Sequence, residues 1–222
     1  CEIRNAENEE IIKKKVFFQR SNSISYFKNE QDIRAVSVSG TFAELIIDKE
    51  ILKQYIDFLY PISSPDENTF AQNQIQLNDL DLMQKFFFNF WKNRNATNPD
   101  LTWEEYHQEV KSVNKDFKNF RVQGYQTDRG RVYLQYGAPN SRHKVENASS
   151  TYPYEIWHYY KLNNQTNKKF VFVNADFATN EYRLEYSNVN GEVSSSEWRD
   201  KIEQQKSPAF GDRFNNDYIN PR

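Results

Sequence analysis

The chain has 222 residues, which is enough to bury a sizeable core in one large domain or two small ones. Its 29 basic and 31 acidic residues leave a net charge of −2, so it lacks the overall basic field that marks nucleic-acid binding. No apolar run approaches the roughly 20 residues that a transmembrane helix needs. The 17 Phe, 14 Tyr and 4 Trp predict a core of large flat side chains and a raised tendency to bind partners.

Cys1 is the only cysteine, which excludes an internal disulfide and a CxxC metal site. Two interpretations of its position stay open: it is the lipidated first residue of a bacterial lipoprotein, or the first residue of a piece of a longer chain. The second is favoured, since lipoproteins usually continue as a polar tether. Here residues 1–4 and 11–18 instead predict the strands of a β-hairpin. We expect this hairpin to end a truncated β-domain.

The first half of the chain predicts amphipathic helices. Asp48 begins the first one, with apolar residues at helical spacing, and Pro61 stops it. Ser64 and Glu67, on either side of a proline, are typical of a capping box. They predict a second helix that ends near residue 76.

Two further helices are expected before the pattern changes. Asn78 or Asp79 begins one of them, and residues 95–99 end it. Residues 102–105, Thr-Trp-Glu-Glu, predict a second capping box. The helix behind that box carries apolar residues at helical spacing as far as Phe120.

After Gly124 short alternating segments predict an antiparallel sheet. Strands are expected at residues 131–136, 154–162, 169–174 and 181–186, with a turn at 137–140 and a polar hairpin loop at 163–167. A final helix is expected over residues 194–205, and residues 207–222 predict an extended tail that orders only against a partner.

The predicted fold class is therefore α+β. An aromatic-rich helical subdomain is followed by a small antiparallel sheet and preceded by a hairpin from a truncated β-domain. We place the hairpin and its linker at residues 1–22, the helical subdomain at 23–123, the antiparallel β subdomain at 124–200 and the extended tail at 201–222.

No constellation predicts a specific chemistry. The histidines His107, expected on a helix surface, His143, expected in a polar loop, and His158 lack metal-type spacing. There is no nucleophile elbow, phosphate loop or HExxH motif. We therefore expect no cofactor, no metal and no catalytic residue. If the protein is instead a hydrolase, Asp128, Glu155 and one histidine are the candidates for acid–base catalysis.

The densest polar and aromatic cluster is residues 124–139. Thr127 and Asp128 can bond nearby backbone groups and fix a turn. If this segment is a strand, Arg129 and Arg131 point the same way.

Two interpretations of this cluster are open. The first is a polar recognition corner, in which Asp128 orients an arginine beside Tyr133 or Tyr136. The second is a buried Asp–Arg brace that joins the helical half to the sheet. We favour the brace, because a bidentate, semi-buried ion pair fixes geometry whereas an exposed pair adds little.

Several segments together resemble the GWxTD domain family, which is widespread in Bacteroidota. They are Phe17–Asn22, the helix Phe86–Asn95, the central motif Gly124–Pro139 and the strand Tyr154–Tyr160, written YEIWHYY. The resemblance covers about residues 16–200, and the signature Trp is Tyr125 here. It implies a longer, exported envelope protein with an N-terminal β-domain and no assigned enzymatic activity. The expected structural or interaction motif comprises Gly124, Tyr125, Thr127, Asp128, Arg129, Arg131, Tyr133, Tyr136, Trp157 and Trp91.

A second resemblance concerns residues 130–186 only. A Gly-x-Pro turn is followed by a strand with Trp157 and Tyr159, by a strand with two Phe and by a strand with Tyr and Leu. This order is similar to that of small outer-membrane assembly lipoproteins of the BamE/SmpA type. Those proteins are accessory subunits of the machine that folds outer-membrane β-barrels.

The two resemblances favour a non-enzymatic accessory or scaffold subunit of an outer-membrane complex that serves barrel assembly, secretion or nutrient uptake. The expected partners are outer-membrane or periplasmic proteins and no nucleic acid. The expected location is the envelope, peripheral to the membrane, with a lipid anchor at or upstream of Cys1 as one option. A glycan-binding envelope module is the main alternative, and a hydrolase is the less favoured one.

Overall fold

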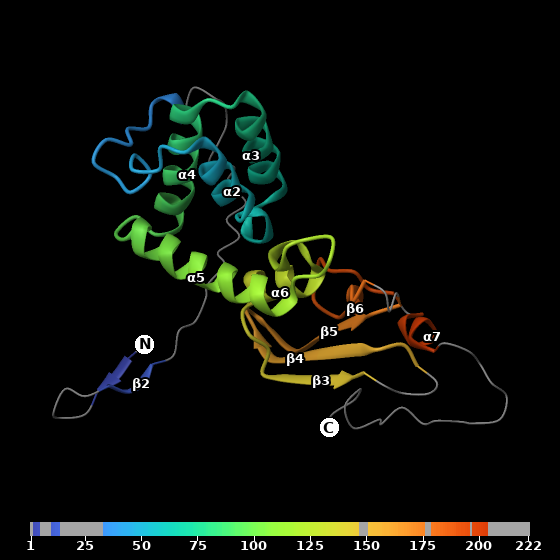
Figure 1. Cartoon of the computed structure of the whole chain (residues 1–222). Helices are drawn as coiled ribbons and strands as arrows, with labels where there is room; N and C mark the ends of the chain where they lie inside the picture. Colours follow the sequence, from blue (N-terminus) through green and yellow to red (C-terminus); the bar gives the residue numbers. More distant parts are fainter. Residues whose placement is uncertain are drawn as a thin grey trace, which may run out of the picture.

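The computed structural model describes residues 2–4, 10–13, 33–146, 151–175, 179–195 and 197–203. Within these ranges the chain forms six α-helices, a hairpin and a four-stranded antiparallel sheet. Most of the helices precede the sheet, so the predicted α+β class and its order are confirmed (Figure 1). The segment 17–22 and most of the predicted tail lie outside the described residues.

The N-terminal hairpin is present in the described residues. Strand β1 (Glu2–Arg4) pairs antiparallel with β2 (Glu10–Lys13), and Ile3 lies opposite Ile12. Within the described ranges, none of the helices combines the length and apolarity needed to cross a membrane.

Four helices build the first half of the molecule. They are α2 (Lys49–Asp57), α3 (Pro65–Leu77), α4 (Leu80–Arg94) and α5 (Pro99–Phe117), with a 3₁₀ turn, η1 (Tyr60–Ile62), after α2. Asp48 and Asp79 cap α2 and α4 as predicted. The Ser64–Glu67 capping box is also confirmed, since each side chain accepts a hydrogen bond from the other residue's backbone N–H.

The second predicted capping box is wrong. Helix α5 begins three residues before Thr102, because Pro99 at its first position is already set to helical φ. The Thr102 hydroxyl instead donates to the Asn98 carbonyl oxygen at 2.9 Å. The helix also ends at Phe117, and Phe120 lies outside it with 90% of its surface exposed.

The strand expected at residues 131–136 is a helix, α6 (Asp128–Tyr136). The Thr127 hydroxyl accepts a hydrogen bond from the Gly130 N–H and so caps the helix start. The alternation that resembled a strand arises because α6 packs on two sides, and Val132 and Leu134 are therefore both buried.

The four-stranded sheet has the order β3-β4-β5-β6, with every neighbouring pair antiparallel. Its strands are β3 (Ser141–Val145), β4 (Tyr154–Leu162), β5 (Gln165–Val173) and β6 (Arg183–Ser187). Strand β4 has the predicted bounds. Strand β5 begins earlier than predicted, since Asn163 adopts a φ of 52° and permits a tighter turn. Strand β3 replaces the polar loop expected around His143, which pairs with Ile156.

Each face of the sheet is covered by helix. One face presents Trp157, Phe170 and Phe172 to a core that continues into the helical half through Phe117. The other face carries a smaller cluster that includes Ile156, Val171 and Val173, and α7 (Trp198–Ile202) packs on it. Helix α7 is shorter than the predicted helix over 194–205. In Figure 1, α6 lies beside the end of α5, where the helical half meets the sheet.

Candidate functional site

The signature segment forms the junction between the helices and the sheet. Gly124–Gln126 is a 3₁₀ turn, η2, and α6 follows it directly. The turn packs on α5, and α6 contacts α5, η2 and β6. The most motif-rich part of the sequence therefore lies where the two halves of the fold meet.

Two glycines allow this junction to pack backbone against backbone. A Cβ on Gly124 would lie 2.1 Å from the Val113 carbonyl oxygen of α5. A Cβ on Gly130 would lie 1.9 Å from the Gly124 carbonyl oxygen. Both distances are far inside van der Waals contact, so no larger residue fits without moving the backbone.

Tyr125 occupies the position of the signature Trp and joins three elements. Its ring packs edge-on against Phe58 with the ring centres 5.0 Å apart. Its hydroxyl donates to the Asp57 carboxylate at 2.6 Å, and its N–H donates to the Asn114 side-chain oxygen at 3.0 Å. Burial, followed by the hydrogen bond to Asp57 and the charge of that residue, raises the pKa of the Tyr125 hydroxyl. The residue thus joins η2 to the end of α2 and to α5.

Thr127 and Asp128 hold opposite sides of the junction. The Thr127 hydroxyl donates to the Gly124 carbonyl oxygen at 2.7 Å and accepts from the Gly130 N–H at 3.1 Å. The Asp128 carboxylate accepts the N–H of Leu184 in β6 at 2.7 Å. The predicted pairing of Asp128 with an arginine is therefore wrong, because the carboxylate binds a strand backbone instead.

The two arginines contact different carboxylates, because residues two apart on a helix point to different sides. Arg129 donates to Glu155 of β4 at 3.1 Å, and both side chains are buried. Arg131 donates to both carboxylate oxygens of Glu192 at 2.9 and 2.8 Å. A brace between the helical half and the sheet side is thus present, but its acidic partners are not the predicted one.

Glu192 also accepts a hydrogen bond from the Tyr136 hydroxyl at 2.7 Å. Burial alone would raise the pKa of the Glu192 carboxyl, but the hydrogen bonds from Arg131 and Tyr136 and the Arg131 charge outweigh it. The net result is a lowered pKa. Glu192 was missed in the sequence, since it lies in a polar turn segment with no motif around it.

The remaining aromatic candidates belong to the core beside the junction. The Tyr133 ring centre lies 6.0 Å from that of Phe117 and 6.4 Å from that of Trp157. Tyr136 packs on Phe170 at 5.3 Å. Sequence reasoning also missed Arg142 of β3, whose guanidinium carbon lies 4.5 Å from the Trp157 ring centre. Rings from α5, α6 and β4 thus pack against one another next to the Arg142 guanidinium.

The candidate acid–base groups are not brought together. Glu155 lies on the α6 face of the sheet, whereas His158 and His143 lie on the other face, as the strand register requires. His107 is half-buried rather than on the surface, stacked on Trp103 with ring centres 4.6 Å apart. In the described part of the chain, no group of three or more His, Cys, Asp and Glu side chains could hold a metal ion.

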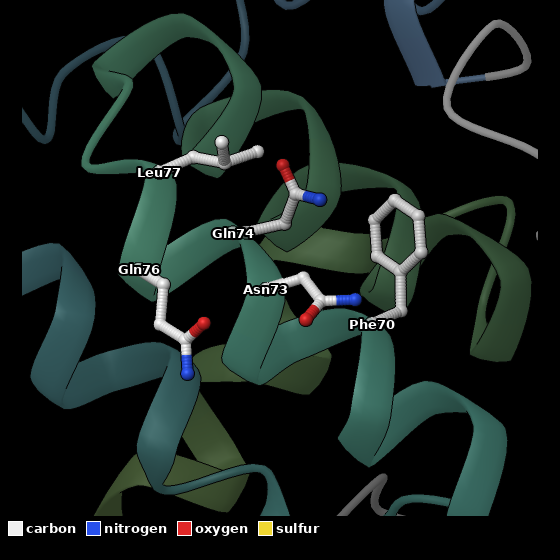
Figure 2. Close-up of a pocket in the computed structure, with 5 residues that line it drawn as sticks. All are labelled: Phe70, Asn73, Gln74, Gln76 and Leu77. Carbon is white, nitrogen blue, oxygen red and sulfur yellow. The ribbon is translucent and has the colours of Figure 1, made fainter.

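An open surface pocket of about 460 Å³ lies away from the signature segment, along α3 (Figure 2). It is lined by Phe70, Asn73, Gln74, Gln76 and Leu77. Among these described residues the polar side chains are all amides, and none of the five carries a charge.

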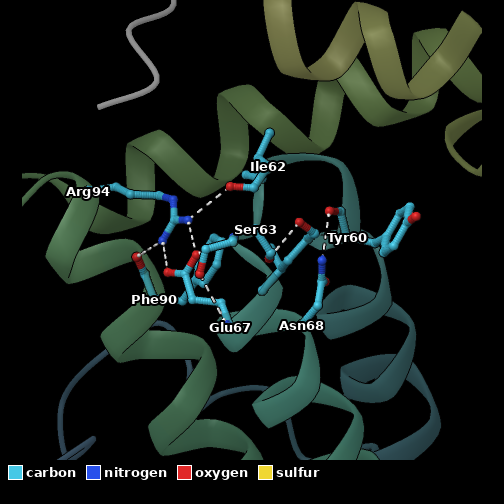
Figure 3. A network of polar contacts seen from close by, with 9 residues as sticks. Tyr60, Ile62, Ser63, Glu67, Asn68, Phe90 and Arg94 are labelled. Atoms are coloured by element: carbon cyan, nitrogen blue, oxygen red, sulfur yellow. Dashed lines mark hydrogen bonds and ion pairs between the residues drawn. The ribbon is translucent and has the colours of Figure 1, made fainter. Parts of the chain in front are cut away.

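The α4 segment that resembles the family helix is also engaged in internal contacts. Trp91 is buried against Phe90, Trp103 and Tyr106, with ring centres 5.3 to 5.7 Å apart. Arg94 donates to both carboxylate oxygens of Glu67 at 3.0 Å. It also donates to the carbonyl oxygens of Phe90, one turn earlier in α4, and of Ile62 in η1 (Figure 3). This bidentate pair ties the end of α4 to the start of α3.

Comparison with known proteins identifies the family. The family model of the GWxTD domain matches residues 28–207, which include α2 to α7 and the four-stranded sheet. No curated protein and no solved structure matches the chain. Because the match extends over most of its length, the chain belongs to the GWxTD domain family.

Proposed function

We propose that this domain is a non-enzymatic accessory or scaffold subunit of a bacterial outer-membrane complex, acting through protein–protein contacts. The observation that carries the proposal is the use of the signature side chains. Each of the five signature side chains at the junction connects two parts of the fold. These side chains are Tyr125, Thr127, Asp128, Arg129 and Arg131. Catalysis instead needs acid and base groups that converge on a substrate.

The surface also supports a role in binding. Several large apolar or aromatic side chains are more than half exposed, including Leu45 at 81%, Ile47 at 77% and Tyr60 at 51%. Tyr is enriched in protein interfaces because it combines a large contact area with a polar group. The envelope location, the outer-membrane or periplasmic partners and a lipid anchor at or upstream of Cys1 come from the family resemblance and belong to the same proposal.

The direct test is to isolate the full protein from its native host under mild extraction and to analyse it by crosslinking mass spectrometry. The expected result is a stable complex with envelope proteins, recovered in the outer-membrane fraction. Recovery of free monomer alone would argue strongly against a scaffold role.

Variants of Asp128 separate the scaffold from a hydrolase that uses Asp128 and Glu155. Asp128→Ala removes the acceptor of the Leu184 N–H and should lower the free energy of unfolding by about 1–3 kcal/mol. Asp128→Asn should lose less, because an amide oxygen can still accept that bond. If the protein is a hydrolase, the Asp128→Asn variant should still fold but should lose turnover of its peptide or glycan substrate.

A glycan-binding module is the second candidate, favoured by the α3 pocket. Uncharged amides beside the Phe70 ring suit hydroxyl groups and the apolar face of a sugar. A glycan array probed with the intact protein tests this function. The function would be supported if the protein binds a glycan and Asn73→Ala removes that binding. Leu101→Ala, at an exposed position on α5, is the control and should keep it. An array without binding would eliminate it.

A further inference from the structure

The loop between α5 and the signature turn, residues 118–123, presents an isolated aromatic side chain to solvent. Phe120 is 90% exposed, and its neighbour Val122 is 37% exposed. A phenylalanine in a monomer's loop is usually at least partly covered, because its exposure costs free energy. Within the described part of the chain the Phe120 ring lies open to solvent, so it is available for contact with a partner.

The loop has a defined backbone. The Asn119 side-chain oxygen accepts the N–H groups of Arg121 and Val122 at 2.8 and 2.9 Å. The Asn119 N–H donates to the Val122 carbonyl oxygen at 3.2 Å. These bonds close a tight turn with Phe120 at its tip.

Both ends of the loop are anchored in the junction. Phe117, just before it, is buried against Trp157. Gly124, just after it, is in backbone contact with Val113 of α5. A contact made by Phe120 would therefore require little further ordering of the backbone, and such preorganisation favours affinity.

Positive charge is concentrated in and beside this loop. Lys118 and Arg121 are exposed, and neither side chain pairs with a carboxylate among the residues that the structure describes. Arg142 adds a third exposed cation, with its guanidinium carbon 5.4 Å from the ring centre of Phe117. Asp116 is the only carboxylate in the sequence from 115 to 123. The local field thus favours an acidic partner.

We propose that Phe120, Val122, Lys118, Arg121 and Arg142 form a docking surface for a partner protein with an apolar pocket bordered by carboxylates. Phe120 is the anchor that enters the pocket, and the three cations face the acidic rim. The inference rests on the proposed scaffold function and names the contact surface for it. It also gives the signature motif a second role, as the rigid base that positions the loop.

An anionic membrane is the competing partner, and the geometry favours a protein. A single myristoyl chain gives only marginal membrane binding, and one phenyl ring buries less apolar surface than such a chain. A rigid turn is of little use at a fluid bilayer, whereas in a shaped pocket it strengthens binding and selects the partner.

The first experiment places the photo-crosslinking residue p-benzoylphenylalanine at position 120 of the full protein in its native host. The matched control places it at position 160, since Tyr160 is also aromatic and exposed but lies on β4. We expect a discrete adduct from position 120 and not from 160. The crosslinked peptide should map to an apolar pocket with Asp or Glu at its border.

The second experiment measures binding of the purified partner that the crosslink identifies. Phe120→Ala should weaken binding by about 10-fold or more, as expected for an anchor residue. Lys118→Glu combined with Arg121→Glu should also weaken binding and reduce its salt dependence. Tyr160→Ala should leave the affinity unchanged. All variants should keep the melting temperature of the wild type, because the substituted side chains are exposed.

The other outcomes of these two experiments show which part of the proposal is wrong. A crosslink to lipid, or cosedimentation with phosphatidylglycerol-containing vesicles that Phe120→Ala abolishes, overturns the protein partner in favour of a membrane. A crosslink to a second copy, or to another part of the same chain, also overturns it. A complex that persists with Phe120→Ala disproves this surface and leaves the scaffold function standing. Absence of any complex disproves the scaffold function itself.

Discussion

At the scale of single residues, the Arg131–Glu192 pair joins α6 to the segment after β6 with two short hydrogen bonds. Because the folded protein holds the Glu192 pKa below its usual value, the ionised carboxylate stabilises the fold above about pH 4.5. That contribution is lost as the pH falls through the lowered pKa. The free energy of unfolding should therefore decrease on acidification below about pH 4.5.

The variant Glu192→Gln tests this dependence. It should be less stable than the wild type at pH 7, where the ion pair is intact, and closer to it at low pH. Urea unfolding over a pH series measures both effects. The exposed Glu50, which pairs with Lys53, gives the matched control, and Glu50→Gln should change little at either pH. Parallel pH curves for wild type and Glu192→Gln would contradict the assignment.

Tyr125 shows how one residue can depart from its family's signature and keep the contact surface. Its ring packs on Phe58 as a flat apolar group, and its hydroxyl bonds to Asp57. Tyr125→Phe keeps the ring and removes this hydrogen bond, so we expect a loss of about 1–2 kcal/mol in stability. A double-mutant cycle with Asp57→Ala, which removes the acceptor, should show coupling when it is measured by chemical denaturation. Additive losses would mean that the bond contributes nothing.

At the scale of elements, the close packing of η2, α6 and α5 depends on two glycines. Gly124→Ala or Gly130→Ala places a Cβ about 2 Å from a backbone carbonyl oxygen, so the elements must move apart. We expect a loss of several kcal/mol or failure to fold, beyond the usual 1–3 kcal/mol of overpacking. Gly40→Ala is the control, since a Cβ there would meet no atom within 4 Å and only the φ of 75° is unfavourable. Equal melting temperatures for all three variants would refute the argument.

The same element shows why local pattern misled for residues 131–136. Val132 and Leu134 are two apart, as in a strand that buries one face. In the fold they are buried because α6 has partners on two sides. Thr127, which was expected only to fix a turn, is the cap of this helix. The caps at Asp48, Ser64 and Asp79 predicted their helices correctly because a cap bonds only to its own first turn.

At the scale of the whole molecule, one apolar core runs from the helices into the sheet. Trp91 in α4 and Trp157 in β4 belong to the same cluster of buried residues. The polar contacts of α6 cross the same junction. We therefore expect the helical and sheet parts to unfold together, because neither can lose its share of the core alone.

Thermal unfolding checks this expectation. Far-ultraviolet circular dichroism, which follows the helices, and tryptophan fluorescence should give one shared midpoint. Arg131→Ala should lower that midpoint without splitting the transition. Two separate transitions would show that the two predicted subdomains are thermodynamically independent.

The sequence by itself determined the fold class, the starts of α2, α3 and α4, the bounds of β4 and the family. These features depend on short-range periodicity, on caps and on motifs that stay within a few residues of each other. Only the tertiary structure decided which groups meet at the junction. Tyr125 and Asp57 are 68 residues apart, and Arg131 and Glu192 are 61 apart. No local pattern specifies such pairs, because their geometry follows from how the helices and the sheet pack around α6.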